Sequence, residues 1–328
     1  MKNCVTNVVT TVTLLALTAT CVGSSHKEEN QVREENLTTP IRIDLTRKGF
    51  ASFTNSRHPG NKIGYRFFEH SPLVYGAIPQ TAEEAGVSKK KSEDAADKFS
   101  NRQGVVVYRH PIRKEEGWEK QYWTFHMAPT DDGIDLLWVI ETGERGLPLY
   151  YGVQQCFRLG GSSNADWRRR IAETPAFSEY DLWESQKDVG SRTSLSWVLR
   201  NDEWEALPAI REGVGARTPL GMKIDNARFQ MKLPDVIGPY KAVAQDPVYC
   251  GLITRTDVEG KWICGIYWEG TSHVTNHHPA DCLHAIVNVG NVPAHSKRSI
   301  RGKIYWFKGS KNDLLTKWRT DFPEPPPE

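Results

Sequence analysis

The chain has 328 residues, with 42 Lys and Arg against 40 Asp and Glu, and a formal net charge of +2. This near balance gives no global basic field, so nucleic acid is excluded as an expected partner. The length allows a large core, either in one all-β domain or in two smaller domains. Eleven Trp and eleven Tyr favour either an ordinary aromatic core or side chains that stack against sugar rings.

The amino terminus has the pattern of a bacterial export signal. Lys2 supplies the positive charge and residues 8–19 the apolar segment, which is too short and too rich in Thr for a transmembrane helix. Residues 17–21 resemble a lipoprotein signal, in which Cys21 receives a lipid; ordinary cleavage without a lipid is the alternative. We therefore expect residues 1–23 to be a signal peptide and the protein to be periplasmic, extracellular or anchored at the cell surface. Membrane contact is expected only through that lipid.

The rest of the chain divides by composition into three parts. Residues 24–40 are polar and charged, with almost nothing to bury, and predict a disordered tether. Apolar segments begin at Ile41 and continue to a last helix, so residues 41–322 are the expected folded domain. The Pro-rich and Glu-rich residues 323–328 predict a disordered tail.

Short β-type segments follow one another through the first half of this domain. They are residues 41–45, 63–68, 73–75, 105–109, 122–127, 134–141 and 149–158. Turn residues separate the last four segments, which predicts an antiparallel meander. Residues 81–101 are rich in Ala, Glu and Lys and predict a helical or loose surface excursion, either solvated or overhanging a cleft.

The second half continues with strands and little helix. Its predicted strands are residues 194–200, 227–233, 248–255, 262–268, 282–289 and 299–307. Residues 165–173 predict a short capped helix, residues 177–183 an aromatic and acidic loop, and residues 310–319 a closing helix. About a dozen strands with long connections predict an all-β protein, a large antiparallel β-sandwich with one or two short helices.

Four cysteines remain after the signal peptide: Cys156, Cys250, Cys264 and Cys282. In an exported protein, disulfides between them are permitted but not required. A two-residue turn at Val258 and Glu259 would pair Ile253 with Cys264. Alternation then places Cys250 and Cys264 on opposite faces of the hairpin, so these two should not bond to each other.

Two segments resemble a known family. The meander around residues 134–138 (Ile-Asp-Leu-Leu-Trp) and the ending at residues 299–305 (Ser-Ile-Arg-Gly-Lys-Ile-Tyr) resemble galactose-mutarotase-like β-supersandwich domains, and the strand rhythm extends the resemblance over residues 41–322. Such domains accompany or constitute sugar epimerases, polysaccharide lyases and glycoside hydrolases. The resemblance therefore implies a supersandwich-like fold and a carbohydrate or polysaccharide as partner. No catalytic motif of a named member falls on the chain, so it assigns no catalytic residue.

Candidate acid–base groups gather in a polar crossover before the strand at 282–289. Five of the ten histidines lie between His273 and His295. An imidazole titrates near the working pH and, with a carboxylate or tyrosine, can carry out the proton transfers of epimerisation or β-elimination. The candidate catalytic residues are His126, Glu141, His278 and His284. His278 is expected on a rim connection rather than within a sheet, where Pro279 limits its backbone.

Candidate substrate-binding residues come from several segments. They are Tyr122, Gln155, Arg168, Trp183 and Trp268. Gln154 and Gln155 point to opposite faces of their strand, and whichever amide is buried must be hydrogen-bonded. Arg168 would attract an acidic sugar, or would lie on a solvated helix face as the alternative.

Alternation along residues 122–127 predicts which side of that strand is buried. Trp123, Phe125 and Met127 are expected to face the core, whereas Tyr122 and His126 are expected to line an open face. An ordinary surface or core role for the strand histidine is the alternative.

The histidine-rich crossover also contains donors for a divalent metal. Cys282 and His284 share a strand face, and three histidines and Asp281 come just before them. The spacing within residues 273–284 matches no zinc signature, so a metal is the less favoured interpretation and no cofactor is expected. A nucleophile elbow, a phosphate loop and a dinucleotide fingerprint are missing from the sequence, so NAD and ATP chemistry are not expected.

Two functions are consistent with these patterns. The favoured one is a carbohydrate-active enzyme of the epimerase, lyase or hydrolase type. The alternative is a non-catalytic glycan-binding or surface accessory protein of the same fold. Catalysis needs ionisable groups that converge in one cleft, which binding does not require. Placement of the four candidate catalytic residues on different surfaces would therefore favour binding.

Overall fold

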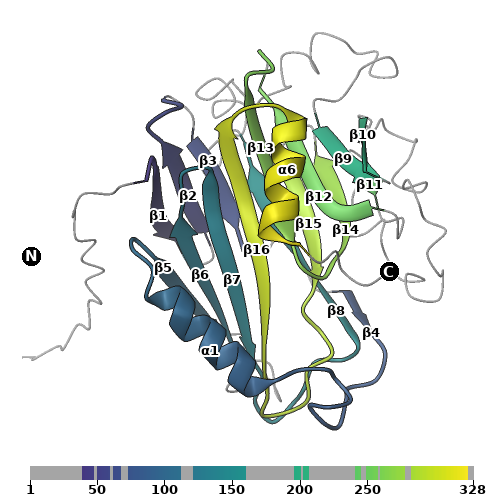
Figure 1. The fold of residues 1–328 in the computed structure, drawn as a ribbon. Helices are drawn as coiled ribbons and strands as arrows, with labels where there is room; N and C mark the ends of the chain where they lie inside the picture. Colours follow the sequence, from purple (N-terminus) through teal and green to yellow (C-terminus); the bar gives the residue numbers. More distant parts are fainter. Residues whose placement is uncertain are drawn as a thin grey trace, which may run out of the picture. The chain divides into compact units, whose positions relative to one another are not determined.

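The computed structural model describes residues 39–47, 50–59, 62–67, 73–111, 121–159, 196–200, 202–206, 241–244, 249–257, 259–277 and 282–323. They form two antiparallel sheets of eight strands each (Figure 1). The first sheet contains β1 (Ile41–Arg47), β2 (Phe50–Asn55), β3 (Lys62–Arg66), β4 (Leu73–Tyr75), β8 (Tyr150–Arg158), β11 (Lys241–Ala244), β14 (Thr271–His277) and β15 (Cys282–Asn288). The second sheet contains β5 (Val106–Pro111), β6 (Tyr122–Pro129), β7 (Gly133–Glu141), β9 (Ser196–Arg200), β10 (Glu203–Ala206), β12 (Tyr249–Thr256), β13 (Trp262–Trp268) and β16 (Lys297–Lys308).

The two sheets are the layers of a sandwich. The first has the strand order β1-β2-β3-β8-β15-β14-β11, with β4 paired to β8, and the second has the order β10-β9-β12-β13-β16-β7-β6-β5. Buried side chains from both sheets share one apolar cluster, so the inner faces pack against each other. The predicted fold class, an all-β antiparallel sandwich with little helix, is confirmed.

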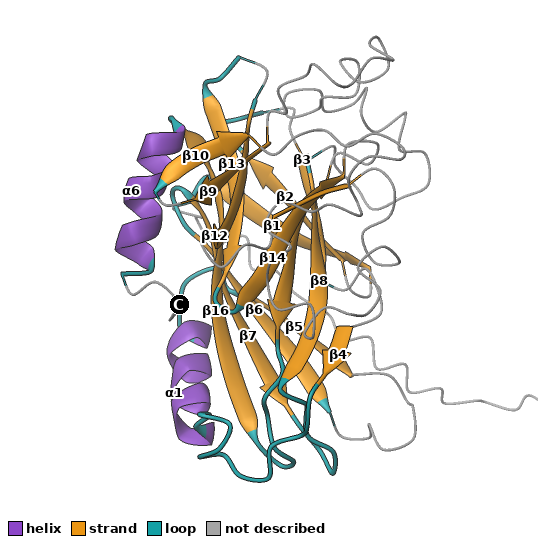
Figure 2. Ribbon diagram, turned by 90° about the vertical axis from the view of Figure 1, so that its right-hand side faces the viewer, coloured by secondary structure: helices purple, strands orange, loops and turns teal. Residues whose placement is uncertain are grey.

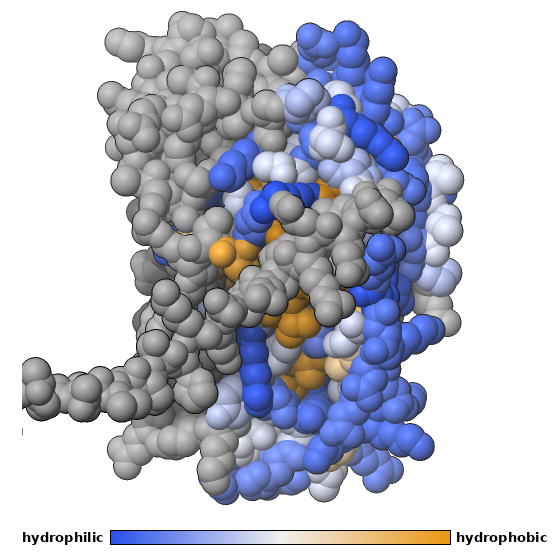
Figure 3. All heavy atoms as spheres, turned by 90° about the vertical axis from the view of Figure 1, so that its left-hand side faces the viewer, coloured by the Kyte–Doolittle hydropathy of each residue, from blue (hydrophilic) through white to orange (hydrophobic). Residues whose placement is uncertain are grey.

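Alternation along the strands builds the core. On β6, Trp123, Phe125 and Met127 face the first sheet, as predicted. The neighbouring strand β7 contributes Ile134, Leu136, Trp138 and Ile140. Each fully buried large apolar side chain contributes roughly 1.5–3 kcal/mol, so the repeated pattern fixes which way each strand faces. Figure 3, seen from the flank of β1 and β5, shows hydrophobic residues at the centre, framed by hydrophilic ones.

Two helices lie outside the second sheet (Figure 2). The closing helix α6 (Lys311–Asp321) begins with a capping box in which Ser310 and Asp313 bond reciprocally. It covers a second apolar cluster that includes Tyr267, Tyr305 and Trp318. Among the described residues, no helix is long and apolar enough to cross a membrane.

The surface excursion predicted at residues 81–101 contains the other helix, α1 (Lys89–Ser100). The Ser88 side chain caps it by accepting the N–H of Lys91 at 3.2 Å. The Ser92 hydroxyl donates to the carbonyl oxygen of Lys297 on β16 at 3.3 Å. The helix therefore rests on the sheet and is not a freely solvated insertion.

The predicted four-strand meander is wrong at its last strand. β5, β6 and β7 are neighbours in the second sheet, but β8 lies in the first sheet between β3 and β15. The connection contains Gly146, where a Cβ atom would come within 2.5 Å of the Val292 carbonyl oxygen. The chain thus passes close to the loop before β16 and changes sheets. Nearly every residue of β8 is buried, and the strand lies at the centre of its sheet.

The histidine-rich segment is a strand rather than a crossover. β14 pairs with β15 through Val274 and Ala285, and with β11 on its other side. Its polar composition hid the strand from sequence reasoning, because Val274 is its single apolar residue. His277 is the last residue of β14 and pairs with Cys282. His278 follows it and lies outside the described residues.

The predicted hairpin of β12 and β13 is confirmed, but its register differs by two residues. Cys264 pairs with Arg255 and not with Ile253, because the turn is centred one residue later in the chain than predicted. The Asp257 carboxylate accepts the N–H of Trp262 at 3.0 Å and closes this loop. A shift of two keeps every side chain on its face. Cys264 faces the core, Cys250 packs against the cluster under α6, and both are free thiols, as expected.

Candidate functional site

The outer face of the first sheet carries a group of polar side chains at its centre. We define the polar face as Ser52 of β2, Arg66 of β3, Gln154, Cys156 and Arg158 of β8, and His284 of β15. His284 points outward because Leu283 and Ala285, on either side of it, belong to the core.

The strand register brings these residues together. His284 pairs with Cys156, and Cys156 pairs with Arg66 on its other side. Arg158 lies two residues along β8 and donates its Nε–H to the Cys156 sulfur at 3.4 Å. The imidazole, the thiol and the two guanidinium groups therefore lie on three adjacent strands, which are spaced about 4.8 Å apart.

Most of the polar face is buried although it lies outside the core. Ser52 and Gln154 are 2% exposed, and Cys156 and His284 are 0% exposed. Burial of hydrogen-bonding groups costs roughly 1–3 kcal/mol each when no partner compensates for lost water. A fold that needed only an inert outer surface would carry apolar or fully solvated residues at these central positions.

Carboxylates are scarce on the described strands of the first sheet. Asp44 on β1 is the single acidic residue in the described strands of the first sheet, and it pairs with Arg42 at 3.0 Å. Four strand spacings separate β1 from β15, or about 19 Å. Asp44 is therefore too far from His284 to join it in acid–base catalysis on a sugar.

Glu141 and Tyr122 lie on the second sheet, directly opposite each other on β7 and β6. The Arg109 guanidinium lies 3.8 Å from the centre of the Tyr122 ring and 3.4 Å from the Glu141 carboxylate. Lys297 approaches the same carboxylate at 3.2 Å. Two of the predicted site residues are thus adjacent, within an ion-paired group on the outer face of that sheet.

His126 is also on the outer face of the second sheet, but α1 covers it. Its Nδ1 lies 3.1 Å from the Ser100 hydroxyl, and the Phe99 ring packs edge-on against the imidazole. Burial lowers the pKa of His126. The open face expected here is closed by the helix. His126 and His284 therefore point away from each other, with the whole core between them.

Gln155 and Trp268 lie between the sheets. The Tyr65 hydroxyl donates to Gln155 Oε1 at 2.6 Å, and Trp268 Nε1 donates to the same hydroxyl at 3.2 Å. Burial raises the pKa of Tyr65 well above its usual value, although the Trp268 hydrogen bond opposes the shift. As expected, the two adjacent amides face opposite ways; both are buried, and Gln155 is hydrogen-bonded between the sheets. Gln154, and not Gln155, belongs to the outer face.

Three predicted site residues lie outside the described residues: His278, Arg168 and Trp183. The same holds for Asp281, one of the donors considered for a metal. Among the described residues, no group of three or more His, Cys, Asp or Glu side chains is arranged to hold a metal ion.

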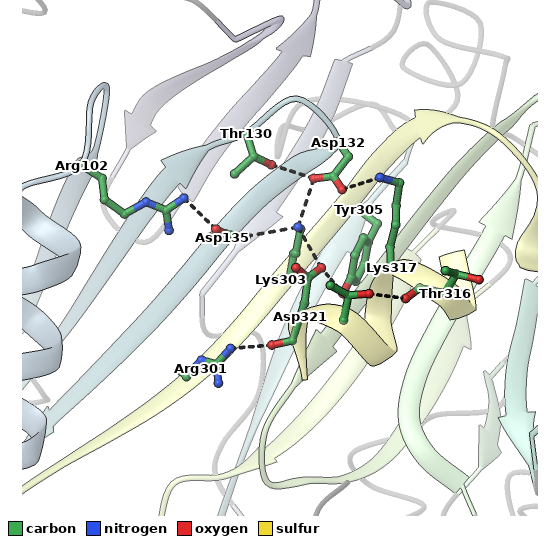
Figure 4. A network of polar contacts seen from close by, with 11 residues as sticks. Arg102, Thr130, Asp132, Asp135, Arg301, Lys303, Tyr305, Thr316, Lys317 and Asp321 are labelled. Atoms are coloured by element: carbon green, nitrogen blue, oxygen red, sulfur yellow. Dashed lines mark hydrogen bonds and ion pairs between the residues drawn. The ribbon is translucent and has the colours of Figure 1, made fainter. Parts of the chain in front are cut away.

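Sequence reasoning missed a buried ion cluster beside α6 (Figure 4). The Lys303 ammonium group lies 3.0 Å from Asp132, 3.4 Å from Asp135 and 2.9 Å from Asp321. The Tyr305 hydroxyl donates to Asp321 at 3.0 Å. The available signal was a lysine at an outward-facing position beside the core residue Ile304. Its partner Asp321 is in a different segment from Asp132 and Asp135, so the sequence could not join them.

The charges of this cluster are balanced. Arg102 pairs with Asp135 at 2.7 Å and Lys317 with Asp132 at 3.0 Å. Burial alone would raise the pKa of Asp132, but the Lys303 and Lys317 ammonium groups hold it below its usual value. Three cations thus face three carboxylates, and the cluster serves to fasten α6 and α1 to the sheet.

Solved structures with a similar arrangement include galactose-mutarotase-related proteins, as the resemblance predicted. A Synechocystis protein has a TM-score of 0.40 and 10% identity, with 83% of this chain and 93% of that chain covered. A galactose mutarotase related enzyme from Lactobacillus acidophilus has a TM-score of 0.37 and 5% identity, with 83% and 98% covered. An α-N-acetylgalactosaminidase from Bifidobacterium bifidum, in complex with GalNAc, has a TM-score of 0.32 and 9% identity, with 87% and 38% covered.

No protein-family model and no curated protein sequence matches the chain. The structural likenesses are too low in TM-score and identity to carry an argument about activity or ligand. The functional conclusion therefore depends on the chain's own residues.

Proposed function

We propose that this chain is an exported carbohydrate-binding protein whose ligand lies across the polar face. A single observation carries the proposal: hydrogen-bonding side chains gather at the centre of an outer sheet face, where a sandwich needs none. Sugar hydroxyl groups both donate and accept hydrogen bonds. The Arg66 and Arg158 guanidinium groups, which are only half-buried, can donate such bonds.

Binding is favoured over catalysis by where the ionisable groups lie. His126 and Glu141 are on the second sheet and His284 is on the first. Glycoside hydrolysis by the usual route needs two carboxylates, up to about 9.5 Å apart. On the described strands of the first sheet the only carboxylate is Asp44, at the far edge. The test described below also distinguishes binding from epimerase or lyase chemistry at His284.

Export is part of the proposal. It is supported by the basic, apolar and small-residue pattern of residues 1–23. Sugars on cell surfaces and in the surrounding medium would then be the accessible ligands. Mass spectrometry of the protein from a bacterial host would identify the cleavage point and any lipid on Cys21.

The proposal is tested with a glycan array followed by titration of the best ligand. Arg66→Ala and Arg158→Ala each remove a half-buried guanidinium group from the polar face, so each should weaken binding by about tenfold, which corresponds to about 1.4 kcal/mol. Tyr122→Ala is the matched control, because it removes a polar aromatic side chain from the outer face of the other sheet. The Tyr122→Ala variant should bind the glycan with the same affinity as the parent protein.

Two outcomes would overturn this proposal. If Tyr122→Ala loses affinity while both polar-face variants bind normally, the ligand lies on the second sheet. If the best ligand is chemically converted and His284→Ala abolishes turnover without changing the melting temperature, the protein is an enzyme. Circular dichroism of each variant confirms that the sandwich is folded.

A further inference from the structure

A cavity of about 350 Å³ lies at the amino-terminal end of α1, away from the polar face. Its lining includes Ser88 and Lys91 of α1, Leu149 just before β8, Asn291, and Arg298 and Ser299 of β16. Segments that are distant in sequence thus meet around one space. Its volume is in the range of about 300–1,000 Å³ that is typical of small-molecule sites.

The lining is cationic and contains no acidic residue. Arg298 is half-buried and its guanidinium donates to the carbonyl oxygen of Gly290. Within the residues that the structure describes, neither Arg298 nor Lys91 forms an ion pair. By contrast, the neighbouring Lys297 pairs with two carboxylates, Glu93 at 3.1 Å and Glu141 at 3.2 Å.

A desolvated guanidinium without a counter-ion is costly to the fold. Burial lowers the pKa of Arg298, and the more distant Glu269 carboxylate only partly opposes this shift. An anion in the cavity would form charge-assisted hydrogen bonds with Arg298 and would be attracted by Lys91. The positive end of the α1 dipole would add to that attraction.

The polar walls are held in place by their own hydrogen bonds. Asn291 has a φ angle of 61°, in the left-handed region that non-glycine residues rarely occupy, and its side chain donates to the Ala85 carbonyl oxygen at 3.0 Å. Its Oδ1 and the Ser299 hydroxyl form no hydrogen bond with described residues. These atoms can therefore bond to ligand hydroxyl groups without disrupting the wall.

One side of the cavity is apolar. Leu149 is 48% exposed, and it and Val107 are the exposed large hydrophobic side chains among the described residues. Its side chain packs against Gly76, where the φ angle is 86° and an added Cβ would come within 2.8 Å of Leu149. A fixed, exposed leucine beside hydrogen-bonding groups suits the C–H face of a sugar ring.

We propose that this cavity is a binding site for a small acidic sugar, with the anionic group on Arg298 and Lys91 and the hydroxyl groups on Asn291 and Ser299. Both a carboxylate and a phosphate can pair with the two cations. Uronic acids carry the first group and sugar phosphates the second, so these are the two ligand classes to compare. The site is separate from the polar face and does not depend on glycan binding there.

The test is calorimetric titration of the full chain with D-glucuronate, glucose 6-phosphate and neutral D-glucose. At least one acid should bind with a roughly millimolar or lower Kd, weakened by added salt, and glucose should not bind. Lys91→Gln should weaken binding several-fold and Arg298→Gln by about tenfold or more. Lys90→Gln is the matched control, because this adjacent exposed lysine does not line the cavity.

The results separate this proposal from the proposed function. Arg158→Ala should leave binding of the acid unchanged, whereas it should weaken binding of the best glycan. Equal loss in Lys90→Gln and Lys91→Gln, binding of glucose as tight as that of the acids, or no binding of either acid would each overturn the proposal. Because Lys91 is exposed, its variant stays informative even if Arg298→Gln does not fold.

Discussion

At the scale of single residues, Lys303 shows how a buried charge is stabilised in this sandwich. Only 6% of its side chain is exposed, and its ammonium group contacts Asp132, Asp135 and Asp321. Burial alone would lower the pKa of Lys303, but the three carboxylates together raise it. The lysine is therefore charged throughout the physiological pH range, and its partners depend on that charge.

Lys303→Met should destabilise the protein by about 3–5 kcal/mol, because it leaves three partly buried carboxylates without their shared cation. Lys317→Met is the control, since Lys317 contacts Asp132 at the same 3.0 Å but is 40% exposed. It should cost less than about 1 kcal/mol. Urea unfolding followed by tryptophan fluorescence measures both values. Equal losses in the two variants would contradict a special role for the buried ammonium group.

At the scale of elements, α1 covers part of the outer face of the second sheet. It closes the outer face of β6 over His126 and at its other end borders the proposed acidic-sugar site. Burial lowers the pKa of His126, so the imidazole is neutral beneath the helix at neutral pH. Protonation would place a charge against Phe99 and Ser100.

Stability should therefore depend on pH through His126. Its folded-state pKa is below the unfolded value of about 6.5, so the unfolded state takes up the proton first as the pH falls. Well above pH 6.5 the His126 imidazole is neutral in both states, so it does not change the free energy of unfolding. As the pH falls below 6.5, the free energy of unfolding should decrease. His126→Gln should lose part of this dependence, and the rest reflects other groups such as His58, whose pKa is also lowered. Urea unfolding at several pH values measures this, and parallel curves for the parent and the variant would refute it.

At the scale of the whole sandwich, the two outer faces differ. The second sheet is covered by α1, α6 and a balanced ion cluster, and its apolar patch packs under α6. The described part of the first sheet carries the polar face and no helix. The inner faces of the two sheets form one shared core, so only the outer faces are available for a ligand. We assign the ligand to the outer face of the first sheet, which carries the polar face.

The sequence predicted strand faces better than it predicted strand neighbours. Alternation identified Trp123, Phe125 and Met127 as core and separated Gln154 from Gln155, because both are local properties of a strand. It could not show that β8 leaves the meander, since pairing depends on contacts between distant segments. Strand β14 was missed because Val274 is its single apolar residue, so no apolar alternation marks it.

The sequence left two roles open for the aromatic residues, an ordinary core or stacking against sugar rings. Among the described tryptophans, Trp123, Trp138, Trp268 and Trp306 are buried in the shared core. The ordinary-core interpretation of these residues is therefore confirmed, and stacking against sugars does not explain them. The Lys303 cluster and the cavity beside Arg298 were out of reach, because each joins residues from segments that only the fold brings together.

The most direct test of the central proposal is a crystal structure of the protein with the glycan that binds best. The account predicts sugar density against the outer face of β3 and β8, with Arg66 and Arg158 within hydrogen-bonding distance of its hydroxyl groups. Density on the outer face of the second sheet, beside Tyr122 and Glu141, would contradict it.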